Sequence, residues 1–155
     1  MTTDIHDVLA RYELRDPQRL LDEIAAAVPL IEGRVYLALV HQPATTQELL
    51  ALEELTPLPV DIDEVHRGRS DLLYDRVWKL AIPTRADDSA SILVTVIVRS
   101  GINGWGQEEK RWAHGWRYSN HNSDAFDRDL MVVTEHGWCS LWSHEGGHEP
   151  AMVAG

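Results

Sequence analysis

The chain has 155 residues, a single cysteine and a formal net charge of −11 at pH 7. This length suits one domain with a sizeable core, and a lone Cys139 excludes an internal disulfide framework and fits a reducing compartment. The acidic balance argues against nucleic acid as a ligand, because phosphate binding draws on clustered lysine and arginine. No apolar run is long enough to span a bilayer, and residues 1–4 lack the features of a signal peptide. We therefore expect a cytoplasmic protein that binds neither nucleic acid nor a membrane.

Two helices are predicted at the start of the chain. In the first, apolar residues recur at the spacing of one buried helix face, at Ile5, Val8, Leu9 and Tyr12. The second is predicted to begin at Asp16 and Pro17, because aspartate suits the N-cap and proline suits the first helical position. Pro29 and Gly33 are expected to end this helix.

A strand and a third helix are predicted next. Residues 34–40 carry apolar side chains in both alternation phases, which is typical of a strand covered on both faces. Thr45 and Glu48 have the spacing of a capping box, which predicts a helix that follows. Residues 1–56 are therefore expected to be mainly helical with one central strand, and residues 57–75 to form an acidic linker.

An antiparallel sheet is predicted for residues 76–143. The predicted strands cover residues 77–82, 92–98, 116–119, 130–135 and 138–143. His136 and Gly137 are expected to form the turn of the last hairpin, since glycine takes a positive φ cheaply. Residues 144–155 are expected to be a flexible tail. The whole chain, residues 1–155, is thus predicted to be one α+β domain with about three N-terminal helices packed on a predominantly antiparallel sheet of about five strands.

One string of residues matches a catalytic motif. Residues 144–148 read HEGGH, and on a helix His144 and His148 would share one face as zinc ligands with Glu145 beside them as the base. Two glycines within one helical turn each cost about 1 kcal/mol relative to alanine, and Pro150 stops the helix at once. A third ligand would have to come from upstream, where the candidates are His114, His121, Glu135 and His136.

A looser metal site is a second possibility. The histidines of the C-terminal half are His114, His121, His136, His144 and His148, and the nearby carboxylates are Asp124, Asp127 and Asp129. Imidazole with carboxylate suits zinc, iron or manganese. The spacing matches no standard ligand set, so each histidine alone is more simply a surface or turn residue.

Tryptophans concentrate in the same half of the chain. Five of the six are Trp105, Trp112, Trp116, Trp138 and Trp142. Such rings supply much contact area with a polar N–H, which suits a concave surface for a flat ligand, a sugar or a partner's side chain. The alternative is packing, in which Trp112 and Trp142 fill the core and Trp105 covers the end of the sheet. Both interpretations stay open.

Carboxylates form a further candidate surface. Between Glu53 and Asp75 seven acidic residues oppose Arg67 and Arg69, so this segment carries a formal charge of −5. A solvated face explains the run most simply. The functional alternative is a docking surface for a basic protein, whose central residues would be Asp61, Asp63 and Glu64.

Together these patterns favour a binding protein over an enzyme. We expect a small acidic protein of bacterial or phage type, inhibitor- or immunity-like, which needs no cofactor. It would present its Trp- and His-rich half or its acidic segment to a protein partner that is itself basic. The alternative is a zinc-dependent hydrolase that uses the HEGGH motif, with His144, His148, His136 and His121 as candidate ligands.

Overall fold

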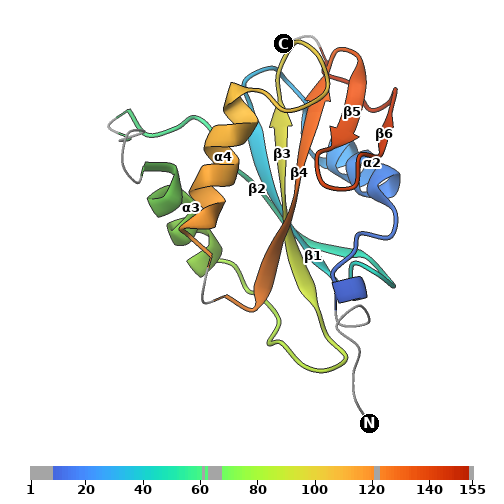
Figure 1. The fold of residues 1–155 in the computed structure, drawn as a ribbon, viewed down its shortest axis with the longest axis vertical. Coiled ribbons are helices and arrows are strands. Elements are labelled where there is room, and N and C mark those ends of the chain that lie inside the picture. The colour runs from blue at the N-terminus through green and yellow to red at the C-terminus, as the bar shows by residue number, and fades with distance from the viewer. Residues whose placement is uncertain (1–8, 61, 63–67, 121–122, 154–155) are drawn as a thin grey trace.

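The computed structural model describes residues 9–60, 62, 68–120 and 123–153. In this part of the chain, helices lie on both sides of one mixed sheet (Figure 1). In chain order the elements are α2 (Pro17–Ala27), β1 (Val35–His41), β2 (Glu48–Glu54), α3 (Gly68–Trp78), β3 (Ser91–Val98), α4 (Gln107–Arg117), β4 (Ala125–Thr134), β5 (Gly137–Ser140) and β6 (Gly146–Gly147). None of the described helices is both long and apolar enough to cross a membrane.

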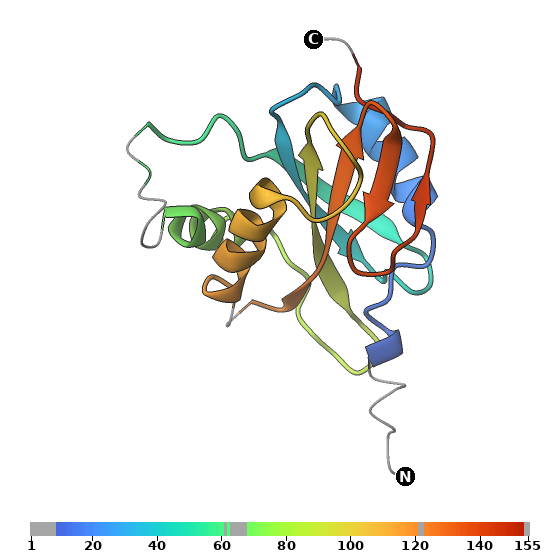
Figure 2. The same ribbon diagram turned by 45° about the horizontal axis from the view of Figure 1, so that its top comes forward.

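The sheet has six strands in the order β2-β1-β3-β4-β5-β6. All neighbouring strands run antiparallel except β3 and β4, which run parallel. Parallel neighbours need a crossover connection, and α4 provides it (Figure 2). Strands β2 and β6 form the two edges. The predicted α+β class is confirmed, but the sheet is mixed and has one strand more than expected. The prediction of about three N-terminal helices is wrong, because α3 and α4 come after β2 in the chain.

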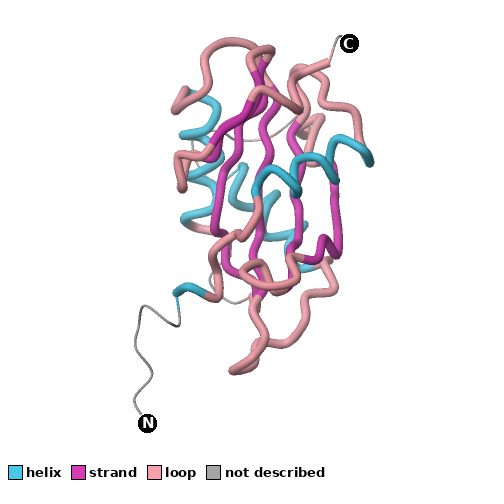
Figure 3. Tube along the Cα trace, turned by 90° about the vertical axis from the view of Figure 1, so that its right-hand side faces the viewer, coloured by secondary structure: helices cyan, strands magenta, loops and turns pink. Residues whose placement is uncertain are grey.

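The centre of the sheet is apolar on both faces. Every residue of β3 is buried, and so are the first six residues of β1. Side chains of alternate positions enter two separate clusters, one under α2 and the other under α3 and α4. Figure 3 views the sheet from the side of α2. The prediction of a strand covered on both faces at residues 34–40 is confirmed.

Helix α2 starts as its sequence predicts. The Asp16 side chain accepts a hydrogen bond from the Arg19 N–H at 3.0 Å, and Pro17 occupies the first turn. Leu20, Leu21 and Ile24 then form its buried stripe. Of the expected first helix, Ile5 and Val8 lie outside the described residues.

Helices α3 and α4 pack tightly against each other on the opposite face. A Cβ atom on Gly115 would meet Arg69 Cβ and Leu73 Cδ1 at 3.2 Å, so the absence of a side chain permits this close approach. The Arg69 guanidinium lies 4.8 Å from the centre of the buried Trp112 ring and pairs with Glu108 at 2.9 Å. These contacts place α4, which carries part of the site described below.

The third predicted helix is wrong, because residues 48–54 form strand β2. Gln47 has a φ of 51° and is buried, and its side-chain amide bonds both backbone groups of Asp16, so the expected cap at Thr45 does not form. Along β2, Leu52 packs on the α2 side and Ala51 on the α3 side. Pairing with the open edge of β1 therefore outweighs the helical propensity of this segment.

Two predicted strands are also wrong. Residues 77–82 contain the last turn of α3 and a loop, from which Leu80 and Ile82 pack against the core as single side chains. Residues 116–119 contain the end of α4. The acidic linker expected at residues 57–75 is likewise partly helical, because α3 begins at Gly68.

The last hairpin exists, but its register differs from the prediction. Val133 pairs with Trp138 and Thr134 with Gly137, so the turn is Glu135 and His136 rather than His136 and Gly137. Gly137 keeps a positive φ of 119° as the first residue of β5. Its Cβ would meet the Gly147 carbonyl oxygen, because β6 lies against this point.

The expected irregular tail is a strand in part. Gly146 pairs with Cys139 and Gly147 with Trp138, which makes β6 the outer neighbour of β5. Further along, the Met152 N–H donates to Thr134 O at 2.9 Å and Val153 forms a bridge to Ile31. Backbone hydrogen bonds hold this segment on the sheet. The pattern of apolar residues along the sequence does not reveal them.

Candidate functional site

A β-bulge in β4 re-aims the acidic residues at its start. Leu93 pairs with Asp127 but Val94 pairs with Asp129, so one extra residue is accommodated in β4. In a regular strand Ala125 and Met131 would face the same side, yet Ala125 packs under α4 and Met131 under α2. The bulge therefore turns Asp127 and Asp129 toward different sides of the sheet.

On the side of β4 that faces away from β3, the same end has no strand beside it among the described residues. Strand β5 pairs only with residues 131–134, so residues 125–130 extend past its end. The chain leaves β5 through a turn at residues 141–145 before it enters β6, and this turn carries Trp142 and Glu145 next to the start of β4. The turn is closed by hydrogen bonds from the His144 N–H to Ser140 O and from the Ser140 N–H to Glu145 O.

Asp129 fixes this turn. Its carboxylate accepts a hydrogen bond from Ser140 Oγ at 2.6 Å and another from the Trp142 N–H at 3.3 Å. Burial raises the pKa of Asp129 to about 6, although both hydrogen bonds and the nearby Arg128 act in the opposite direction. A carboxylate with a perturbed pKa that lines a cavity is a common mark of a functional site.

A second loop brings Trp105 to the same place. Arg99 at the end of β3 donates from Nε to Glu109 Oε1 at 2.7 Å and from Nη2 to Gly104 O at 2.9 Å. Glu109 on α4 is fully buried, so the pair is a rigid support beneath the loop. Thr134 Oγ1 donates to Asn103 Oδ1 at 2.6 Å and holds the other side.

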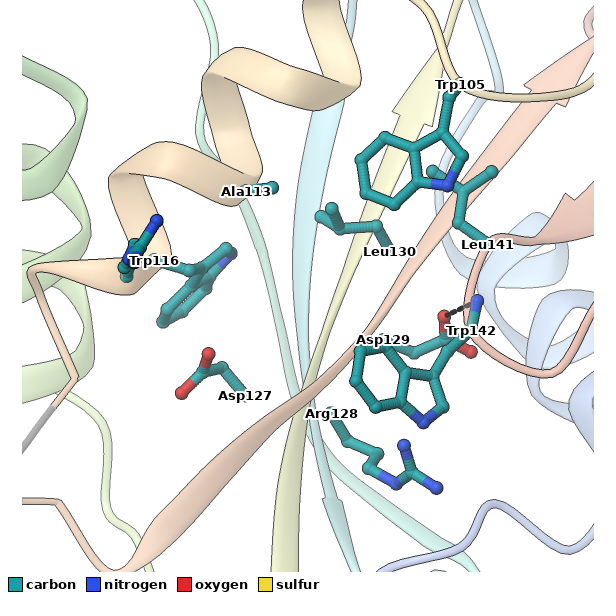
Figure 4. A pocket seen from close by; sticks show the side chains of 10 residues that line it. Trp105, Ala113, Trp116, Asp127, Arg128, Asp129, Leu130, Leu141 and Trp142 are labelled. Atoms are coloured by element: carbon teal, nitrogen blue, oxygen red, sulfur yellow. Dashed lines mark hydrogen bonds between the residues drawn. The ribbon is translucent and has the colours of Figure 1, made fainter.

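These elements enclose a hollow of about 240 Å³ (Figure 4). Its lining residues are Trp105, Ala113, Trp116, Arg117, Asp127, Arg128, Asp129, Leu130, Leu141 and Trp142. We call it the tryptophan hollow. Trp105 and Trp142 remain 52% and 63% exposed, whereas Trp116 is buried and donates from Nε1 to Thr95 Oγ1 at 2.7 Å. Two open indole rings therefore stand over an apolar floor of Leu130 and Leu141.

An adjoining hollow of about 340 Å³ has a different lining. Its residues are Glu13, Leu14, Pro17, Arg128, Asp129, Trp142, Ser143 and Glu145. We call it the acidic hollow. Three residues, Arg128, Asp129 and Trp142, line both spaces, and the Arg128 guanidinium lies 4.9 Å from the centre of the Trp142 ring.

The structure divides the five predicted tryptophans into two groups. Trp105, Trp116 and Trp142 come together at the tryptophan hollow. Trp112 is completely buried under α3, and Trp138 is buried under α2, where its Nε1 donates to Glu149 O at 3.0 Å. The alternative in which Trp142 fills the core is wrong, because Trp142 lies exposed in the turn after β5.

Residues 144–148 do not form the helix that the zinc-hydrolase interpretation needs. Gly146 and Gly147 are in β6, and His144 has a φ of 63° at the end of the preceding turn. Along an extended chain two residues four positions apart are separated by about 13 Å, against about 6 Å on a helix face. His144, His148 and Glu145 are exposed, and Glu145 faces the acidic hollow.

No group of three or more metal-binding side chains occurs among residues 9–60, 62, 68–120 and 123–153. His136 lies in the β4–β5 turn, where its Nε2 is 3.4 Å from Glu135 Oε1. His121 lies outside the described residues, as do Asp61, Asp63 and Glu64 of the predicted acidic docking surface.

Sequence reasoning missed one aromatic pair. Tyr74 and Trp78 stack on α3 with ring centres 6.2 Å apart, and Trp78 is 75% exposed. The two rings border a hollow of about 190 Å³ with Asp124 on its rim. A helical pattern through Leu73 and Val77 was the available signal, because it places Tyr74 and Trp78 one turn apart on an outer face.

Asp129 itself was considered only as a metal ligand. The triplet Asp127, Arg128 and Asp129 just before a predicted strand is visible in the sequence. The bulge that separates the two carboxylates has no such signature, because it depends on how β3 and β4 pair.

Comparisons with models of protein families, with curated protein sequences and with solved structures give no match to this chain. A functional conclusion therefore depends on the geometry and chemistry of the site alone.

Proposed function

We propose that this chain is a protein-binding domain that holds a side chain of its partner in the tryptophan hollow. The observation that carries the proposal is the pair of indole rings, Trp105 and Trp142, which stay more than half exposed over a preformed apolar floor. Aromatic residues of this kind dominate the energetics of protein interfaces, where they form the centre of the contact.

The size of the hollow supports a side chain as the occupant. Pockets for cofactors and drug-sized ligands usually measure roughly 300–1,000 Å³. The tryptophan hollow, at about 240 Å³, falls below this range. It suits one apolar side chain that a partner inserts between the rings.

The surroundings of the hollow support a preformed site. Buried anchors hold both tryptophan-bearing loops, Glu109 with Arg99 on one side and Asp129 with Ser140 on the other. Binding to preformed loops loses little conformational entropy. The inhibitor- or immunity-like class expected from the size and charge of the chain remains part of the proposal.

Selection from a random peptide library displayed on phage tests the proposal. We expect the wild-type protein to enrich peptides that lose binding to Trp105→Ala and to Trp142→Ala. Trp78→Ala is the matched control, because Trp78 is also exposed but lies on α3 and does not line this hollow. Enriched peptides that bind Trp105→Ala and Trp142→Ala as well as the wild type, or no enrichment at all, would contradict the proposal.

A further inference from the structure

Two hollows of different chemistry share one wall. The tryptophan hollow has an apolar floor, whereas the acidic hollow is lined by the carboxylates of Glu13, Asp129 and Glu145. Arg128 is the one basic residue among the described residues that line the acidic hollow. The formal charge of the acidic hollow is therefore −2, in a chain whose net charge is −11.

Arg128 compensates only part of the negative charge of the acidic hollow. The Arg128 guanidinium lies over the Trp142 ring, and this contact already shows that the indole face accepts a guanidinium group. Glu13 and Glu145 are exposed. An additional cation in the acidic hollow would gain from the negative charge of these carboxylates.

The two hollows adjoin each other, because Arg128, Asp129 and Trp142 line both of them. In an extended segment, side chains at positions i and i+2 point the same way and are about 6.6 Å apart. One partner segment can therefore reach both hollows.

We propose that the partner presents an extended segment with an apolar side chain and, two positions away, a basic side chain. The apolar side chain enters the tryptophan hollow, and the basic one enters the acidic hollow against Glu13, Asp129 and Glu145. This inference rests on the proposed function, and it adds the chemistry of the partner. A basic partner is thus recognised by the carboxylates of one site as well as by the overall negative charge of the chain.

Isothermal titration with four blocked pentapeptides tests the inference. Their central residues are Leu-Ser-Arg, Leu-Ser-Ser, Ser-Ser-Arg and Leu-Ser-Glu, each flanked by glycine. We expect Leu-Ser-Arg to bind at least about tenfold more tightly than Leu-Ser-Ser, and Leu-Ser-Glu to bind most weakly. The expected factor is that of one charge-assisted contact of about 1.4 kcal/mol.

Variants that neutralise single carboxylates separate the effect of the acidic hollow from the effect of the net charge of the chain. We expect Glu13→Gln with Glu145→Gln to reduce the advantage of Leu-Ser-Arg over Leu-Ser-Ser to less than threefold, and to leave Leu-Ser-Ser unchanged. Both residues are exposed, so the fold stays intact. Glu32→Gln is the control, because Glu32 is exposed between α2 and β1 and lines neither hollow.

The outcomes distinguish this inference from the proposed function. If Leu-Ser-Ser and Leu-Ser-Arg bind equally and both lose binding to Trp142→Ala, the tryptophan hollow binds a side chain but the inference is wrong. An arginine advantage that survives Glu13→Gln with Glu145→Gln also overturns it. If none of the four peptides binds the wild type more tightly than Trp105→Ala with Trp142→Ala, the proposed function fails and the inference fails with it.

Discussion

Gly137 is the residue whose replacement is most sharply constrained. Its φ of 119° disfavours any side chain, and a Cβ atom would meet the carbonyl oxygen of Gly147 and Cα of His148 at 2.8 Å. Gly33 has a similar φ of 91° but its Cβ would meet nothing within 4 Å. The two glycines therefore separate backbone strain from a steric clash with β6.

We expect Gly137→Ala to lower the free energy of unfolding much more than Gly33→Ala. The conformational term costs roughly 1–2 kcal/mol at either position. The clash at Gly137 adds about 1–3 kcal/mol, because β6 must move away. Urea denaturation measures both values, and equal losses would show that β6 does not lie against Gly137.

Asp129 makes a prediction about pH. Its pKa in the folded protein is raised from an ordinary 3.8 to about 6, so the folded state binds this proton more tightly than the unfolded state. The stability from this group is fully present below pH 4 and is lost as the pH rises toward 6. At higher pH the contribution of Asp129 to the free energy of unfolding no longer changes with pH.

The comparison with Asp129→Asn isolates this effect from all other titrating groups. Between pH 4 and pH 8 the unfolding free energy of the wild type is expected to fall relative to that of the variant by at most about 3 kcal/mol. Urea denaturation at several pH values gives the difference. A difference that does not change with pH would mean that Asp129 has an ordinary pKa.

At the scale of elements, the loop that carries Trp105 depends on one buried ion pair. Glu109 is fully buried and Arg99 supports Gly104 O at the same time. Removal of one partner leaves a charge without its counterion in a largely apolar place, which costs about 3–5 kcal/mol. The pair thus links the stability of the sheet to the position of the hollow.

We expect Glu109→Leu to destabilise the protein by about 3 kcal/mol or more and to increase the exposure of Trp105. Arg99→Met with Glu109→Leu is expected to cost less than the sum of the two single changes, because no unpaired charge remains. Denaturation gives the energies, and acrylamide quenching of Trp fluorescence gives the exposure. Additive effects would show that the two side chains act independently.

The elements that the sequence predicts correctly are those with a local cause. The cap at Asp16 and Pro17 fixes the start of α2, and apolar residues in both alternation phases mark β1 as a strand covered on both faces. The error at β2 arises because the segment Glu48–Glu54 has good helix formers and its strand state depends on pairing with β1. Nonlocal partners decide that segment, and a single sequence does not reveal them.

The candidate site follows the same rule. The tryptophans that matter were found among the five predicted, because indole rings are conspicuous in composition. Which of them face outward depends on the ends of β5 and on the turn after it. The acidic hollow was not predicted, because Glu13 and Glu145 are far apart in the chain and meet only through the fold.

For the whole molecule, the net charge of −11 makes a kinetic prediction. The carboxylates of the whole chain attract a basic segment before contact, whereas those in the acidic hollow hold it afterwards. Neutralising Asp61, Asp63 and Glu64 together is therefore expected to slow association of the Leu-Ser-Arg peptide and flatten its salt dependence. Glu145→Gln is expected mainly to speed dissociation.

Stopped-flow fluorescence at several salt concentrations separates the two rate constants. Wild-type association should slow as salt is added, because screening shortens the range of the attraction. If the triple variant associates at the wild-type rate at low salt, the segment from Glu53 to Asp75 has no part in steering. The prediction of an acidic docking surface would then be wrong.

The edge strand β2 gives the chain a safeguard against pairing with itself. In the described part of the chain no strand lies beside its outer backbone groups, and such an edge is a template for a second copy. Glu48, Glu53 and Glu54 lie along it, so two copies side by side would bring like charges together. This protection is electrostatic and therefore reversible: in acid, where carboxylates take up protons, copies of the folded chain are expected to associate through β2 into a continuous sheet.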